Sequence, residues 1–264
     1  MNMKSEIIER CRGKIQEKLA LRELPEVTIK VRHFDGPDRR GHYRLPEHED
    51  HVHEPAEFLR DSRWFDKVIQ QFKVAYYDLP HNTRKDIPYE VYLIEPLIRL
   101  GNAVIAGGLN WVIMGTLKNG EKYAAIKDVE VRPMLRECSL MTLMTHAEME
   151  LAKERGCDFI HTWHSRENTT FLAVVVPELE AGFMFYRGDV KDGEEYEDAG
   201  CLHLRYYFDQ EKDRNVPVLF KDGKESKSPG GNPDIIHHLM RFKKYPGREI
   251  KRIGEYKRSF SKLS

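Results

Sequence analysis

An Asn-Gly pair between two apolar runs constrains the fold of this chain more than any other feature. Residues 102–117 read NAVIAGGLNWVIMGTL, residues 122–131 read KYAAIKDVEV, and Lys118-Asn119-Gly120-Glu121 lies between them. Asn-Gly flanked by apolar strands is the strongest short-range signal for a β-hairpin. The sequence therefore predicts two adjacent antiparallel strands, the first of them a single buried strand.

The remaining periodicities predict an alternation of helices and strands around this hairpin. Helices are expected over residues 5–24, 55–80, 139–155 and 168–179, with Pro177 poorly placed inside the last one. Strands are expected over residues 26–34, 89–96, 157–164, 182–188 and 201–208. From residue 27 onward this order predicts the α/β class, with a mixed β-sheet flanked by helices.

Three segments are expected along the chain: an N-terminal helix over residues 1–25, a domain over 26–209, and a basic C-terminal extension over 210–264 that packs on the domain. Residues 241–264 carry nine Lys/Arg and two Asp/Glu, a net charge of 9 − 2 = +7. Such a tail is either a solvated surface or a contact for a phosphorylated ligand, an acidic carrier protein or RNA.

Bulk charge and cysteine usage indicate a cytoplasmic protein. Lys plus Arg and Asp plus Glu each number 43, so nothing favours nucleic acid or an anionic membrane as a partner. The four cysteines are scattered, the N-terminus lacks an apolar signal core, and no apolar run approaches the roughly 20 residues of a membrane span.

The stretch from VEVRPMLR to Ala181-Gly182-Phe183 resembles the GNAT superfamily of N-acetyltransferases, with the likeness covering about residues 27–208. That family shows a strand ending in Val-x-Pro, an Arg-x-x-Gly-x-Gly/Ala loop, a helix, a strand ending near Asn, and a helix running into Gly-Phe. The matching positions are Val131, Pro133, Arg136, Asn168, Gly182 and Phe183. Ser139 and Met141 stand where the family has glycine or a small residue.

The resemblance implies an acyl-CoA-dependent N-acyltransferase, with acetyl-CoA as donor and an amine of a small molecule or protein as acceptor. The pantetheine arm would pair with the strand at Val129 and Val131, and Asn168 would bond the arm or cap the next helix. The pyrophosphate would lie at the helix N-terminus, on the loop of Arg136, Glu137, Cys138, Ser139, Leu140 and Met141. Ser139 is also expected to cap that helix.

The candidate acid–base residues lie on three strands. Asp128 and Glu130 are expected to share one strand face, because residues i and i+2 point to the same side, and either is a candidate base. His164 is a candidate acid–base group near the end of its strand. Tyr186 would replace the family's tyrosine general acid, which the helix before Gly182 lacks.

Other functions stay open at this stage. The altered loop is compatible with a binding protein that has lost turnover, or with an acyl-carrier-protein donor. His48, His51 and His53 form a metal-competent loop, which His81 would complete, but their spacing suits no regular helix face and no metal is expected. A homodimer is left open.

Overall fold

The computed structural model describes residues 3–34, 83–165, 171–185 and 201–209. The chain divides into two compact units, Met1–Asp158 and Phe159–Ser264, and each is considered by itself. The predicted helix over residues 55–80 and the extension over 210–264 lie outside the described residues. None of the helices within the described ranges is long and apolar enough to cross a bilayer.

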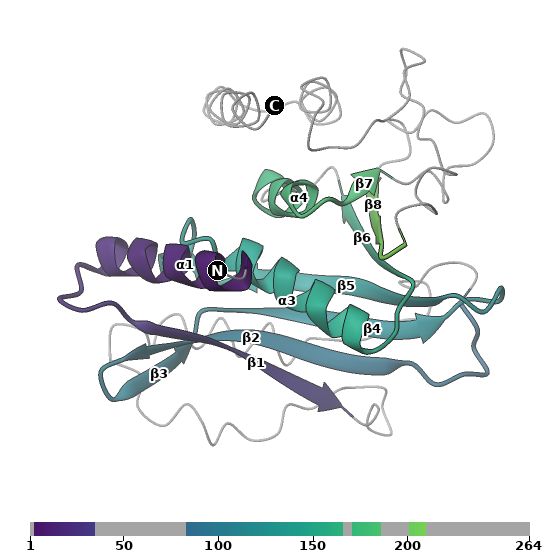
Figure 1. Ribbon diagram of the computed structural model, residues 1–264, viewed down its shortest axis with the longest axis horizontal. Coiled ribbons are helices and arrows are strands. Elements are labelled where there is room, and N and C mark those ends of the chain that lie inside the picture. Colours follow the sequence, from purple (N-terminus) through teal and green to yellow (C-terminus); the bar gives the residue numbers. More distant parts are fainter. Residues whose placement is uncertain (1–2, 35–82, 166–170, 186–200, 210–264) are drawn as a thin grey trace, which may run out of the picture. The chain divides into compact units, whose positions relative to one another are not determined.

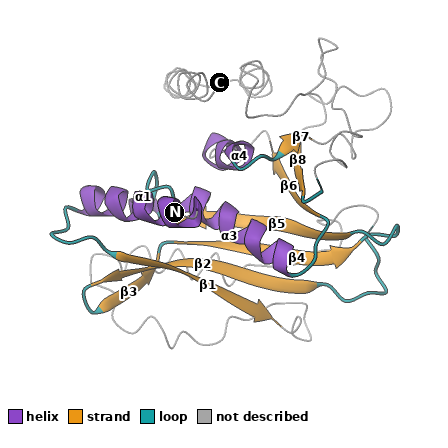
Figure 2. Ribbon diagram, in the orientation of Figure 1, coloured by secondary structure: helices purple, strands orange, loops and turns teal. Residues whose placement is uncertain are grey.

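The first unit is built on an antiparallel sheet (Figure 2). Its strands follow the order β1-β2-β4-β5, and β3 also pairs with β2. Their bounds are β1 (Glu26–Phe34), β2 (Glu90–Leu100), β3 (Ala103–Ala106), β4 (Gly108–Thr116) and β5 (Lys122–Val131). The hairpin predicted from Asn-Gly is confirmed: Gly120 has φ 91°, and the Leu117 amide donates to the Glu121 carbonyl at 2.8 Å.

The expectation of one continuous strand over residues 102–117 is wrong, because the run divides at Gly107 into β3 and β4. The Gly107 amide donates to the Pro96 carbonyl at 2.7 Å. A Cβ on Gly107 would lie 2.7 Å from Ile98 Cδ1 and 2.9 Å from Leu140 Cδ1, so a larger residue would clash there. A side chain at position 107 would therefore require the ends of Ile98 and Leu140 to move aside.

Two helices cover one face of this sheet (Figure 1). Helix α1 (Met3–Leu19) contacts β1 and helix α3 (Leu140–Glu154), and α3 also contacts β2, β4 and β5. Helix α1 ends earlier than predicted, where Ala20 takes φ 51° and the Leu21 amide bonds the Gln16 carbonyl. The core beneath the helices consists of Ile7, Cys11, Ile15, Val27, Ile98, Ile105, Leu135, Cys138, Leu140 and Leu143.

The second unit combines a short antiparallel sheet with one helix. Strand β8 (Cys201–Tyr207) pairs with both β6 (Phe159–Ser165) and β7 (Met184–Phe185), and α4 (Phe171–Glu180) contains Pro177. Helix α4 contacts β6. Helices packed on β-sheet confirm the predicted α/β fold class.

Candidate functional site

The turn between β5 and α3 holds the strongest candidate for a ligand site. After Val131 the chain forms a short 3-10 helix, η3 (Pro133–Leu135), and α3 begins at Leu140. Arg132 is fully buried, and its Nε donates to the Ala106 carbonyl at 2.9 Å while its amide donates to Gly107 at 3.0 Å. Arg132 therefore fastens the start of the turn to the neighbouring strands.

Two non-glycine residues of this turn have left-handed backbone conformations, Glu137 at φ 72° and Ser139 at φ 62°. Ser139 occupies the N-cap position of α3, as predicted, but its side chain does not make the capping hydrogen bond that was expected. The first amides of an α-helix have no partner within the helix. At α3 these amides receive no hydrogen bond acceptor from the Ser139 side chain, and amides at a helix N-terminus are suited to bind an anion.

Helix α1 brings two lysines to the same turn. Lys14 Nζ donates to Ser139 Oγ at 2.9 Å, and Lys18 Nζ donates to the Arg136 carbonyl at 2.5 Å. Both lysines are exposed, and their i, i+4 spacing places them on one face of the helix. Together with the exposed Arg136 they place three cations at the turn, and no pattern in the sequence predicts that these residues lie together. We call Lys14, Lys18, Arg136 and Ser139 the basic turn.

The other predicted loop residues contribute differently. Cys138 and Leu140 are each 1% exposed and belong to the core, and Met141 is 9% exposed. Burial raises the pKa of the Cys138 thiol, so this cysteine stays protonated. These three residues can meet a ligand through their backbone amides, whereas the exposed Glu137 places a carboxylate at the turn.

A β-bulge alters the end of β5, the predicted pantetheine strand. Leu109 pairs with Glu130 and Trp111 with Lys127, so β5 has one residue more than β4 between these two pairs. Asp128, inside the bulge, takes φ 48°. The extra residue interrupts the period of two on which the expectation of a shared face for Asp128 and Glu130 rests, so that expectation stays a prediction.

Glu130 is half-buried at the end of this bulge. Burial raises the pKa of its carboxyl, the Arg136 charge opposes that rise, and Asp128 adds to it. A carboxylate with a raised pKa takes up protons more readily near neutral pH, as a general base requires. Val129 and Val131, its neighbours on β5, are likewise partly buried.

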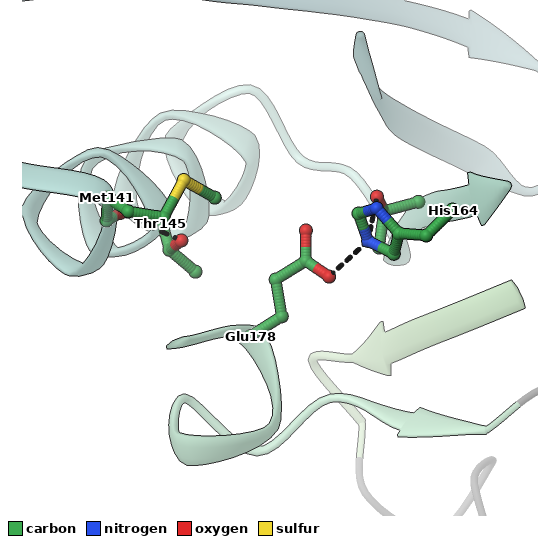
Figure 3. A network of polar contacts seen from close by, with 5 residues as sticks. Met141, Thr145, His164 and Glu178 are labelled. Carbon is green, nitrogen blue, oxygen red and sulfur yellow. Dashed lines mark hydrogen bonds and ion pairs between the residues drawn. The ribbon is translucent and has the colours of Figure 1, made fainter. Parts of the chain in front are cut away.

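In the second unit, the predicted His164 on β6 faces a glutamate that the sequence analysis missed. His164 Nε2 lies 2.7 Å from Glu178 Oε2 of α4, and Figure 3 shows the two side chains directed at one another. His164 is 6% exposed and Glu178 is fully buried. The only sequence signal for Glu178 is a carboxylate within the apolar helix FLAVVVPELE.

The other predicted site residues cannot be placed. Asn168, Tyr186 and the histidines His48, His51 and His53 lie outside the described residues. Within the described part of the chain, no group of three or more His, Cys, Asp or Glu side chains is arranged to hold a metal ion.

Comparison with known proteins finds similarity in solved structures alone, because no family model and no curated protein matches the chain. A Klebsiella pneumoniae protein described as an acyl-CoA N-acyltransferase is 15% identical, with a TM-score of 0.38 over 69% of this chain and 97% of that one. A Staphylococcus aureus acetyltransferase of the GNAT family is 15% identical, with a TM-score of 0.34 over 68% and 99%. A Bacillus subtilis acetyltransferase in complex with CoA is 12% identical, with a TM-score of 0.33 over 69% and 99%.

Proposed function

We propose that this protein is a cytoplasmic N-acyltransferase that transfers an acyl group, most simply acetyl, from coenzyme A to an amine of a small molecule or protein. The observation that carries the proposal is the basic turn, where Lys14 donates to the Ser139 hydroxyl and Lys18 to the Arg136 carbonyl, just before the first residue of α3. A nucleotide pyrophosphate has the charge and the acceptor oxygens that such a turn would bind.

The basic turn offers a way to bind a pyrophosphate without a glycine-rich loop. The positive φ values of Glu137 and Ser139 supply the conformation that glycine adopts most easily. An exposed methionine side chain at this place would hinder a phosphate, but the Met141 side chain is almost fully buried. Lys14, Lys18 and Arg136 would outweigh the negative charge of Glu137.

Acyl transfer also needs a group that removes a proton from the acceptor amine. Glu130 is proposed as this base because burial raises the pKa of its carboxyl. Asp128 would support it electrostatically from the bulge, and backbone groups of Val129 and Val131 would pair with the pantetheine amides. His164 is a second acid–base candidate, and Tyr186 and Asn168 remain proposals on the sequence alone.

A second candidate function is that of a binding protein without turnover. Glu137 favours this candidate, because an exposed carboxylate beside the turn weakens anion binding.

Measuring the release of free thiol from acetyl-CoA distinguishes the two candidates. Purified protein is incubated with acetyl-CoA and a panel of amines, comprising a free peptide N-terminus, a lysine peptide, spermidine and an aminoglycoside, and free CoA is measured.

The proposal expects release with at least one amine, and it expects Glu130→Gln to reduce that release by about 100-fold or more while acetyl-CoA still binds. Glu154→Gln, an exposed glutamate at the end of α3, is the matched control and should leave the rate unchanged. Binding of acetyl-CoA without release from any amine would favour the second candidate. An acyl-carrier donor would show itself by release from acylated carrier protein alone.

A further inference from the structure

Helix α1 carries a row of three cations, Arg10, Lys14 and Lys18, in steps of one helical turn. All three residues are exposed, and residues four positions apart lie on one face of a helix, about 6 Å apart along its axis. Lys14 donates to the Ser139 hydroxyl, and Lys18 donates to the Arg136 carbonyl. These contacts direct this face of α1 toward the basic turn, and Arg10 continues its positive charge along the helix.

Arg10 also lies close to α3. Burial lowers the pKa of His146 on α3, the Arg10 charge lowers this pKa further, and Glu150 opposes both effects. Charges at a protein surface act on one another mainly within about 10 Å at 0.1 M salt, so Arg10 is a near neighbour of His146. Helices α1 and α3 are in contact. The row of cations therefore continues from the start of α3 along the side of this helix.

The row of cations is unfavourable for α1 itself. Like charges four residues apart destabilise a helix, and Arg10–Lys14 and Lys14–Lys18 are both such pairs. Glu6, one turn before Arg10, offsets this repulsion at one end of the row only. Within the described residues the Arg10 guanidinium makes no hydrogen bond or ion pair. An anion bound beside Arg10 would offset the repulsion and give the guanidinium a partner.

Coenzyme A carries an anionic group for which the basic turn does not account. Its ribose bears a phosphomonoester at the 3′ carbon, one sugar away from the diphosphate. Such a monoester has a charge of about −1.5 to −2 at pH 7 and three acceptor oxygens, and a guanidinium can bond two of them at once. The Arg136 charge acts on Glu130, so the reacting end of the donor would lie on the Arg136 side of the turn. The ribose would then extend to the other side, toward Arg10.

We propose that Arg10, together with Lys14, binds the ribose 3′-phosphate of the donor and makes the protein selective for acetyl-CoA over acetyl-dephospho-CoA. This inference rests on the proposed function, and it names a residue that determines the specificity for the donor. Arg10 supplies a planar pair of N–H donors to the monoester, and Lys14 supplies a point charge between the monoester and the diphosphate. The selectivity comes from charge and hydrogen bonding alone, and no covalent step is involved.

The test is a thermodynamic cycle that combines two ligands with two full-length proteins, measured by calorimetric titration. The unmodified protein should bind acetyl-CoA about 2- to 30-fold more tightly than acetyl-dephospho-CoA, as expected for two exposed charge contacts. Arg10→Met should weaken acetyl-CoA binding by about 2- to 5-fold and leave acetyl-dephospho-CoA binding unchanged. Arg10→Lys keeps the charge and should retain part of the preference. Arg84→Met is the matched control, because Arg84 is exposed and its amide bonds the Thr116 carbonyl, at the end of β4 away from the turn.

Equal affinity of the unmodified protein for the two donors, or an undiminished preference in Arg10→Met, would overturn this inference and leave the proposed function standing. An equal loss of both donors in Arg10→Met would also overturn it, because a distant charge acts on the diphosphate as well. Binding of neither donor would overturn the proposed function together with this inference.

Competition against acetyl-CoA identifies the phosphate that the row of cations binds. Adenosine 3′,5′-bisphosphate should displace acetyl-CoA at lower concentration than adenosine 5′-diphosphate, which has two phosphates but none on the 3′ carbon. Arg10→Met should remove this difference between the two nucleotides. Displacement by inorganic phosphate at the same concentration as by the bisphosphate would show a site for free phosphate, and it would contradict recognition of the ribose 3′-phosphate.

Discussion

The left-handed backbone of Ser139 makes a prediction about stability that can be calibrated within the same protein. Ser139 and Gly101 have nearly the same φ, 62° and 63°, and a Cβ added at Gly101 would meet no atom within 4 Å. A residue with a Cβ is less stable than glycine in this conformation by about 1–2 kcal/mol. Glycine offsets about 0.4–1 kcal/mol of this difference, because it gives the unfolded chain more conformational entropy. The net preference for glycine at either position is therefore about 0.5–1 kcal/mol.

Ser139→Gly and Ser139→Ala both remove the hydroxyl that accepts from Lys14, so their difference isolates the backbone effect. We expect the glycine variant to be more stable than the alanine variant by about 0.5–1 kcal/mol, and Gly101→Ala to cost about the same relative to the unmodified protein. Urea unfolding followed by circular dichroism measures all three free energies. An alanine variant at position 139 as stable as the glycine variant would refute the left-handed turn.

Three further predictions concern the core and its ionisable groups. Ile15→Ala should lower the free energy of unfolding by about 2–5 kcal/mol in urea unfolding, because Ile15 is fully buried between α1 and the sheet, whereas Leu24→Ala at an exposed site should have little effect. Burial raises the pKa of Cys11 and of Cys157 to about 12. Iodoacetamide at pH 8 should therefore label neither cysteine in the native protein and both after unfolding, as measured by peptide mass spectrometry. Labelling of the native protein would contradict their burial. Folding raises the pKa of Glu130, so the contribution of this residue to stability is full below the ordinary glutamate pKa and is lost as pH rises through the folded value. The change in the free energy of unfolding caused by Glu130→Gln should therefore be more favourable at pH 7 than at pH 4. The reverse order in urea unfolding at the two pH values would contradict the raised pKa.

Features set by neighbouring residues could be predicted from the sequence. The β4–β5 hairpin follows from Asn119-Gly120, and the end of α3 follows from Gly156, which takes φ 71°. Both depend on the backbone preferences of a few adjacent residues.

Features set by contacts between distant segments could not be predicted. Gly107, where the predicted strand divides, lies against Leu140, 33 positions later, and the basic turn depends on Lys14 lying against Ser139. The bulge at Asp128 has only a weak local signal, since aspartate tolerates a left-handed conformation without requiring it. Alternation assigned Asp128 and Glu130 to one face, and the extra residue opposite β4 interrupts the period on which that assignment depends.

Calorimetric titration of acetyl-CoA tests most directly whether the basic turn binds the donor. The proposal predicts binding to the unmodified protein and, for the double variant Lys14→Met/Lys18→Met, an affinity about 2- to 30-fold lower, from two exposed charge contacts of about 0.2–1 kcal/mol each. Lys153→Met, which removes an exposed lysine in the last turn of α3, should leave the affinity unchanged. No binding at millimolar acetyl-CoA, or equal affinity in the double variant, would contradict the account.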